Sequence, residues 1–260
     1  MKEKLKIQSR KVQFEGFDGN LLEGNLDFPL DVVPKQYIII SHCFTCTKQI
    51  LTTARLSRGL AHSAMAVLSF DFTGLGYSEG EFADTHFRSM VKDIECAADW
   101  LATHYEPASI LIGHSMGGTA SLAASQNTGT ALSHVQKLIT LASPAYPAHV
   151  LHHFGSAMSK LRNGDNAQIT VAGRAYEVKP AFIEDVESYD MDKQMESCDL
   201  PILAVRAGED ELVGPEAAEQ ILQYSRAENR LIEIQGADHI FSDRAHATQL
   251  LNDVINWIEY

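Results

Sequence analysis

A short segment around Ser115 constrains the fold of this chain more than any other feature. Residues 109–112 are a mostly apolar run, residues 113–117 have the sequence Gly-His-Ser-Met-Gly, and residues 119–124 are small. This order predicts a buried strand, a tight G-x-S-x-G turn and a helix. The two glycines lack a Cβ, so the strand and the helix can cross closely, and the turn would expose the serine hydroxyl beside free N–H groups at the helix start. A glycine-rich turn without a chemical role fits the same residues, so the interpretation depends on partners elsewhere.

Strand and helix patterns alternate along most of the chain, which indicates an α/β fold. The predicted strands are residues 11–17, 21–28, 37–41, 65–70, 109–112, 137–141, 201–206 and 230–234. The predicted helices are residues 52–63, 84–104, 119–124, 215–224 and 246–258. The first two strands flank Asp18-Gly19-Asn20, a signal typical of a hairpin. Alternating elements imply right-handed crossovers, so we expect a mostly parallel central sheet with this N-terminal hairpin at one antiparallel edge.

Residues 146–197 interrupt this alternation. The segment contains Pro147, three closely spaced histidines, and residues 168–178, which have the pattern of a hairpin. Long insertions between strands are often lids or binding loops, and this one is too small to form a large core of its own. We therefore expect one α/β core domain, residues 1–145 and 198–260, with residues 146–197 inserted as a cap.

Composition and charge exclude several classes of protein. Hydrophobic residues make up 45% of the chain, charged residues 21%, and the net charge is −13, which argues against disorder and against binding to nucleic acid or to an anionic membrane. The N-terminus has no apolar signal segment, and no apolar run is long enough to span a membrane. These features predict a cytoplasmic protein with reduced cysteines rather than disulfides. They predict no metal or cofactor and leave a homodimer open.

A serine at such a turn needs a base to accept its proton and an acid to orient that base. Asp210 directly follows a predicted strand, and His239 directly follows the last one. Since the carboxyl ends of parallel strands meet at one edge of the sheet, we expect Ser115, Asp210 and His239 to converge as nucleophile, orienting acid and base. The neighbouring Glu209 and Glu211 are expected to be solvated loop charges.

Two backbone N–H groups would stabilise the oxyanion formed on attack by the serine. The first is the N–H of Met116, which follows the serine. The second should come from the loop after the strand at residues 37–41, and we expect the N–H of Phe44 to supply it.

Together these segments resemble a serine hydrolase of the α/β-hydrolase superfamily. The matching segments are His42-Cys-Phe-Thr45, Asp71-Phe-Thr-Gly-Leu-Gly-Tyr-Ser78, Gly113-His-Ser-Met-Gly117, Asp210 and Gly236-Ala-Asp-His239. Two of them, residues 42–46 and 70–76, resemble the hydrolase half of bacterial proteins that fuse this fold to an OsmC-type domain. The hairpin of the insertion resembles the small cap of feruloyl and cinnamoyl esterases. The resemblance implies an α/β-hydrolase fold and hydrolysis of a small-molecule carboxylic ester through an acyl-enzyme. Thioesterase, amidase and acyltransferase chemistry on the same triad stay open.

Five residues are candidates for lining the substrate pocket: Cys43, Phe154, Met158, Tyr176 and Phe182. Many relatives carry glycine where this chain has Cys43, so its side chain could narrow the oxyanion loop. The other four belong to the insertion and could equally pack it against the sheet.

Two other classes of protein compete with the hydrolase hypothesis. Cys43 and Cys46 form a C-x-x-C motif at a strand end, which is the position of thioredoxin-like redox motifs. That fold would leave Ser115, Asp210 and His239 without a role. A non-catalytic binding module on the same fold is the other alternative, and such a protein would usually lack one member of the triad.

Overall fold

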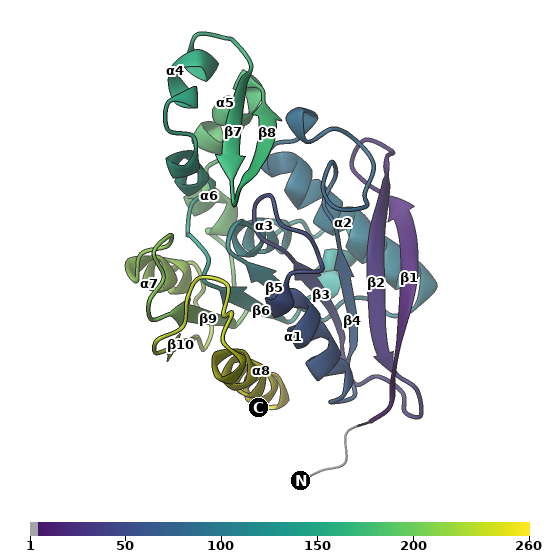
Figure 1. Cartoon of the computed structure of the whole chain (residues 1–260). Helices are drawn as coiled ribbons and strands as arrows, with labels where there is room; N and C mark the ends of the chain where they lie inside the picture. The colour runs from purple at the N-terminus through teal and green to yellow at the C-terminus, as the bar shows by residue number, and fades with distance from the viewer. Residues whose placement is uncertain (1–4) are drawn as a thin grey trace.

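The structure is a computed structural model that describes residues 5–260. An eight-stranded sheet with the strand order β1-β2-β4-β3-β5-β6-β9-β10 forms its centre (Figure 1). The strands of this sheet are β1 (Ile7–Glu15), β2 (Leu21–Pro29), β3 (Tyr37–Ser41), β4 (Ala66–Phe70), β5 (Ile110–His114), β6 (Lys137–Leu141), β9 (Ile202–Ala207) and β10 (Arg230–Ile234). From β4 to β10 all neighbours pair in parallel, and β1 and β2 pair antiparallel. The predicted α/β fold with an N-terminal hairpin at one edge is confirmed.

Helices cover both faces of the sheet. The α-helices are α1 (Leu51–Ala61), α2 (Phe87–His104), α3 (Met116–Ala124), α4 (Ala157–Arg162), α5 (Pro180–Ser188), α6 (Met191–Met195), α7 (Glu216–Gln223) and α8 (Arg244–Glu259). Short 3-10 turns occur at η1 (Phe82–Asp84), η2 (Ala131–His134) and η3 (Pro147–His153). Among residues 5–260, no helix has both the length and the apolar character needed to cross a lipid bilayer.

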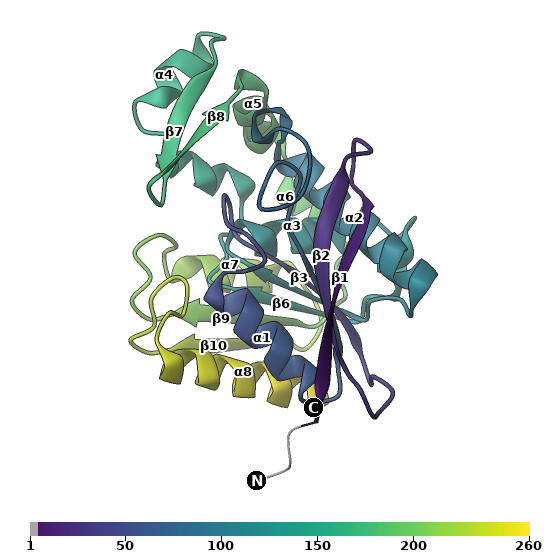
Figure 2. The same cartoon turned by 45° about the vertical axis from the view of Figure 1, so that its right-hand side comes forward.

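Alternate residues of each central strand point into two separate cores. In β3, Ile38 and Ile40 pack with α1 and α8 on one face, whereas Ile39 packs with α2 and α3 on the other. Figures 1 and 2 show α1 and α8 together on one side of the sheet, and the two helices are in contact. Both faces of the parallel strands are thus buried, which explains why their sequences are nearly continuous apolar runs.

Side-chain caps move the starts of two helices from the predicted positions. The helix expected at residue 84 begins at Phe87, because the His86 side chain accepts from the N–H of Ser89 and the Ser89 hydroxyl pairs with the N–H of His86. The last helix begins at Arg244, two residues before the expected start, because the Asp243 carboxylate caps its first turn.

Residues 146–197, here called the insert, form a separate layer above one end of the sheet (Figures 1 and 2). The insert contains η3, α4, α5 and α6, and the hairpin of β7 (Ala167–Val171) and β8 (Arg174–Val178), which pair antiparallel. Its hairpin turns at Ala172 and Gly173, both with positive φ, as the sequence predicts. The division into a core domain and a cap stays a prediction.

Candidate active site

Ser115 lies on a sharp turn between β5 and α3. Its φ of 53° and ψ of −128° are unusual for a residue with a side chain, and its N–H donates to Leu141 O at 2.9 Å. A Cβ on Gly113 would lie 2.3 Å from Gly118 Cα, and one on Gly117 would lie 2.3 Å from His42 O. The two glycines are therefore required by close backbone contacts on both sides of the serine.

The structure brings Asp210 and His239 together from two neighbouring strand ends. His239 Nδ1 lies 2.8 Å from Asp210 Oδ2 and 3.0 Å from Asp210 Oδ1. Burial alone would raise the pKa of Asp210, but the hydrogen bond and charge of His239 and the N–H groups of Leu212 and Val213 outweigh it, so the pKa lies below its usual value. The carboxylate therefore stays ionised and favours the tautomer with a proton on Nδ1, which leaves Nε2 free to accept a proton.

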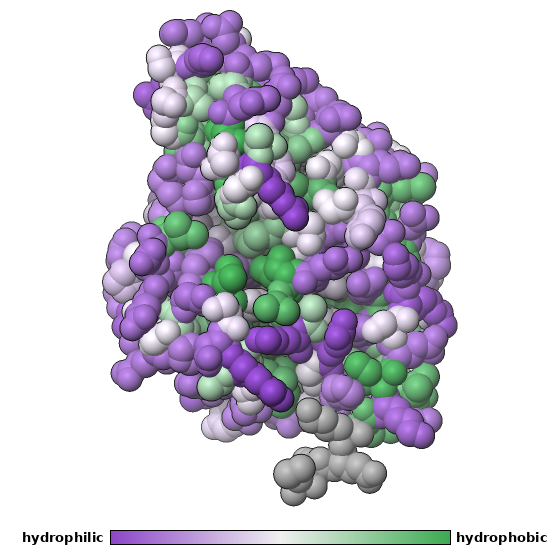
Figure 3. Space-filling model, in the orientation of Figure 1, coloured by the Kyte–Doolittle hydropathy of each residue, from purple (hydrophilic) through white to green (hydrophobic). Residues whose placement is uncertain are grey.

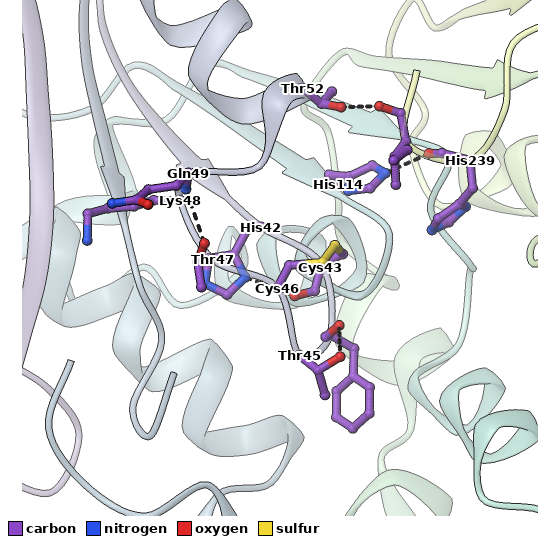
Figure 4. Close-up of a disulfide and its surroundings, with 12 residues drawn as sticks. His42, Cys43, Thr45, Cys46, Thr47, Lys48, Gln49, Thr52, His114 and His239 are labelled. Carbon is purple, nitrogen blue, oxygen red and sulfur yellow. Dashed lines mark hydrogen bonds between the residues drawn. A yellow bond between two sulfur atoms is a disulfide. The ribbon is translucent and has the colours of Figure 1, made fainter. Parts of the chain in front are cut away.

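His114, which precedes the serine, connects the turn to His239. Its Nε2 lies 2.8 Å from His239 O, and the two rings have centroids 5.0 Å apart (Figure 4). Burial, and then the nearby His239, lower the pKa of His114 to about 3, so its ring is neutral and donates to the carbonyl. Within residues 5–260, Ser115 Oγ and the His239 ring form no direct hydrogen bond. The turn that carries Ser115 is thus connected to the His239 backbone through the side chain of His114.

The loop after β3 presents the predicted second oxyanion donor. Across residues 5–260, neither the N–H of Phe44 nor that of Met116 donates to another protein atom, so both are free to bind an oxyanion. The loop is fixed by a buried ion pair, in which Lys48 Nζ lies 2.5 Å from Asp71 Oδ2 and the Lys48 N–H donates to Asp71 Oδ1 at 2.7 Å. His42 adds a further connection, since its Nε2 accepts from the N–H of Phe72 at 3.3 Å. No motif in the sequence predicts these roles of His42 and Lys48.

Cys43 and Cys46 are joined by a disulfide in this loop (Figure 4), so the expectation of reduced cysteines is wrong for this pair. The physical reason is local: a turn in which the Cys46 N–H donates to Cys43 O holds the two Cα atoms 5.3 Å apart, within bonding range. Cys96 and Cys198 are free, as expected. Cys46 lies five residues before α1, so the pair does not stand at the start of a helix, where thioredoxin-like motifs place their reactive thiol. This position argues against the redox hypothesis.

A cavity of about 20 Å³ adjoins the serine. Its lining residues are Phe44, Ser115, Met116, Pro144, His149, Val150, His152, His153, Leu212 and Val213. Cys43, Phe154, Met158, Tyr176 and Phe182, predicted as candidates, do not line it, because Phe154 and Phe182 are buried against Phe44 and the Tyr176 hydroxyl donates to Thr45 O at 3.0 Å.

The histidines of η3 form one wall of this cavity. His149 Nε2 lies 2.8 Å from Leu212 O, and the His153 ring stacks on Phe44. Burial, followed by the charges of neighbouring histidines, lowers the pKa of His153 to about 4, so this ring is neutral at pH 7. Among residues 5–260, no group of three or more His, Cys, Asp or Glu side chains has the arrangement of a metal site. The spacing of these histidines at one helical turn places them on one face of a helix but does not show that this face closes a cavity beside Ser115.

An elbow serine, a His–Asp pair and two free N–H groups at the carboxyl ends of parallel strands define the α/β hydrolases as a class. The chain belongs to the family described as serine aminopeptidase, S33, whose model matches residues 33–185, and is therefore a hydrolase. The esterase domain of a Rhodothermus marinus protein is similar, with 30% identity, a TM-score of 0.75 and coverage of 96% of this chain and 97% of that domain.

Two further structures share the fold at lower identity. Est1E of Butyrivibrio proteoclasticus, solved with ferulic acid bound, is 19% identical, with a TM-score of 0.77 and coverage of 95% and 98% of the two chains. Mouse alpha/beta hydrolase domain-containing protein 10 is 18% identical, with a TM-score of 0.75 and coverage of 96% and 98%. A comparison with curated proteins found no match. The resemblance to OsmC-fused proteins stays a prediction.

Proposed function

We propose that the protein is a serine esterase that hydrolyses small carboxylic esters through an acyl-enzyme. The observation that supports this most directly is the His239–Asp210 pair, in which His239 Nδ1 lies 2.8 Å from Asp210 Oδ2. The backbone carbonyl of His239 is also hydrogen-bonded to His114, the residue before Ser115. The esterase domain at 30% identity favours an ester over an amide as the substrate.

In the first half of the reaction, Ser115 Oγ attacks the ester carbonyl while His239 Nε2 accepts its proton. Asp210 stabilises the imidazolium, and the N–H groups of Met116 and Phe44 bind the oxyanion. A hydrogen bond between Ser115 Oγ and His239 Nε2, absent from the described residues 5–260 of the free protein, forms when substrate binds, since such contacts often become short only in the substrate complex. Collapse of the intermediate expels the alcohol, which takes the proton from His239.

In the second half, water enters and His239 Nε2 accepts one of its protons. The hydroxide attacks the acyl carbonyl, the oxyanion returns to the same two N–H groups, and Ser115 leaves with the proton from His239. The carboxylic acid is released. No metal or cofactor takes part in this proposal.

The test is hydrolysis of p-nitrophenyl acetate and butyrate by the wild type, Ser115→Ala and Asp210→Asn. We expect kcat to fall by at least about 10³-fold in Ser115→Ala and by about 10³–10⁴-fold in Asp210→Asn, since triad members act as a unit. Glu211→Gln, which changes an exposed carboxylate beside Asp210, is the matched control and should keep wild-type kcat.

A fluorophosphonate probe separates the remaining classes. It should label Ser115 in the wild type and nothing in Ser115→Ala. Absence of labelling together with equal rates for wild type and Ser115→Ala would leave only a binding module. Faster turnover of a matched p-nitroanilide or thioester than of the ester would reassign the substrate class while keeping the triad.

A further inference from the structure

Two small cavities meet at the side chain of Phe44. The outer cavity, of about 20 Å³, is the one lined by Ser115 and Met116. The inner cavity, of about 10 Å³, is lined mainly by apolar side chains, among them Phe72, Leu75, Phe82, Met90 and Phe182. Phe44 lines both cavities, so its ring separates the serine from the inner cavity. Each cavity has room for about one water molecule, so neither admits an acyl chain as it stands.

Aromatic neighbours hold the Phe44 ring at this position. Its centroid lies 5.5 Å from that of Phe82, 5.6 Å from that of Phe182 and 6.3 Å from that of Phe154, and the ring stacks on His153 on another side. Phe44 is only 7% exposed. Because three elements of the molecule supply these contacts, rotation of the ring would disrupt several favourable pairs at once.

Strand order indicates the side of Ser115 on which each part of an ester would lie. Phe72, Phe44, Ser115, Asp210 and His239 follow β4, β3, β5, β9 and β10, which lie in that order across the sheet. His239 protonates the leaving alcohol, so the alcohol lies on its side of the serine. The acyl group then lies on the opposite side, toward Phe44 and the inner cavity.

The surface on the alcohol side has a different character. Leu51 and Ile240 are exposed there and lie close together, because the Thr52 hydroxyl donates to Ile240 O. Figure 3 shows a hydrophobic area on the face where α1 begins and the loop before α8 passes. The leaving group thus meets an open surface, while the acyl group meets a closed wall.

We propose that the Phe44 side chain determines acyl-chain specificity by closing the acyl side of the site, so that the enzyme hydrolyses short acyl esters. This inference rests on the proposed esterase function. Replacing the benzyl side chain with a methyl group would join the two cavities into one larger space, with Phe72, Leu75, Phe82, Met90 and Phe182 as the apolar part of its wall and Thr73, Thr85, Ser89 and Asp93 as the polar part of the inner end. Engineered cavities with apolar side chains in their walls can bind molecules such as benzene. The enlarged space would therefore accept a medium-length or phenyl-bearing acyl group.

The experiment compares kcat/KM for p-nitrophenyl acetate, butyrate and octanoate in the wild type, Phe44→Ala and Met90→Ala. The wild type should prefer acetate or butyrate, and the octanoate-to-acetate ratio should rise at least about tenfold in Phe44→Ala, the effect of a methylene or more of fit. Met90→Ala is the matched control: it removes a buried side chain from the inner cavity but keeps the Phe44 ring, so its ratio should stay within about twofold of wild type.

The outcomes separate this inference from the proposed function. A wild type that hydrolyses none of the esters contradicts the proposed function. A wild type active on acetate, combined with a folded Phe44→Ala of unchanged ratio, overturns the inference alone. If Phe44→Ala loses all activity, binding of benzene is measured by NMR in Ser115→Ala and in Phe44→Ala/Ser115→Ala. Benzene binding by the double variant but not by Ser115→Ala supports the inference. Equal benzene binding, or none, in the two variants overturns it.

Discussion

At Ser115, the positive φ and the neighbouring glycines have one physical cause. The chain leaves β5, reverses and enters α3 within a few residues, so strand and helix backbones touch at Gly113 and Gly118. The strain of the serine backbone, of order 1–3 kcal/mol, is compensated by these contacts and by its hydrogen bond to Leu141. A sequence with larger residues here could not build the turn.

Gly113→Ala tests this packing. The added Cβ would meet backbone atoms of Gly117 and Gly118 at 2.3–2.5 Å, and backbone cannot move aside as a flexible side chain can. We expect a loss of about 3 kcal/mol in the free energy of unfolding and a Tm lower by roughly 6–12 °C, measured by thermal unfolding. Gly129→Ala is the control, because a Cβ there meets nothing within 4 Å. Equal Tm values for both variants would contradict the close crossing.

The residues of the site divide into those that a sequence reveals and those that it does not. Asp210 and His239 could be proposed because each directly follows a strand, and parallel strands bring such positions together. Lys48 and the wall of His149 and His153 could not, because they depend on the paths of two loops across the strand ends. No periodic pattern encodes those paths. The roles of the triad residues stay predictions.

At the scale of elements, the loop between β3 and α1 is constrained at both ends. The disulfide closes its first turn, and the Lys48–Asp71 pair fixes the residues before α1. The sequence showed the C-x-x-C spacing but not whether the thiols approach each other, since this depends on the turn that the loop adopts. The same loop presents the N–H of Phe44, so its rigidity would preorganise the oxyanion site that we propose.

Reduction of the disulfide should lower stability measurably. A loop closed over residues 43–46 restricts the unfolded chain by about 2 kcal/mol, so dithiothreitol should lower the Tm of the wild type by roughly 4–8 °C. The double variant Cys43→Ser/Cys46→Ser should have about the Tm of the reduced wild type, and dithiothreitol should not change it, although the variant keeps Cys96 and Cys198. A reductant effect that persists in the double variant would assign the change to those two cysteines instead.

Asp93 on α2 is hydrogen-bonded to two other parts of the chain, the turn at Phe17 and the loop at Thr73, and gives a second prediction at this scale. Burial raises its pKa to about 6, against the opposing effect of hydrogen bonds from the N–H groups of Thr73 and Phe17. Because the folded pKa exceeds the unfolded value, its stabilising contribution is complete below about pH 4 and is lost as the pH rises through 6.

Asp93→Asn removes this titration. The difference in unfolding free energy between wild type and Asp93→Asn should therefore shift against the wild type between pH 4 and 6.5, by on the order of 3 kcal/mol. Urea unfolding across this range measures the shift, and an NMR titration of the Asp93 carboxyl carbon measures the pKa directly. A constant difference across the range would show that the hydrogen bonds fully offset burial.

At the scale of the whole molecule, the insert packs against the loop that carries Phe44. Phe154 and Phe182 of the insert pack on Phe44, and the Tyr176 hydroxyl bonds to Thr45 O. The break in the alternation of strand and helix patterns predicted that residues 146–197 are an insertion between strands of the sheet. It did not show that they enclose the oxyanion loop, because contacts between distant segments leave no periodic signal.

Arg88 and Asp185 form the main polar connection between α2 and the insert. The N–H of Arg88 donates to Asp185 Oδ2 at 3.0 Å, its guanidinium pairs with Oδ1, and the guanidinium carbon lies 5.0 Å from the Tyr189 ring centre. The Asp185 side chain is only 9% exposed, so loss of the guanidinium would leave a mostly buried carboxylate with a single backbone donor. This pair should therefore limit how far α5 separates from the core.

Arg88→Ala should increase hydrogen–deuterium exchange in α5 while exchange in β5, at the centre of the sheet, stays as in the wild type. Arg162→Ala is the matched control, because it removes an arginine–glutamate pair within the insert whose side chains are 64% and 45% exposed. Pairs so exposed contribute little, so exchange in α5 should not change in that variant. If hydrogen–deuterium exchange in α5 is the same in Arg88→Ala and Arg162→Ala, the insert is held mainly by its apolar contacts with Phe44 and its neighbours. The Phe44 ring, which we propose closes the acyl side, would then also anchor the insert.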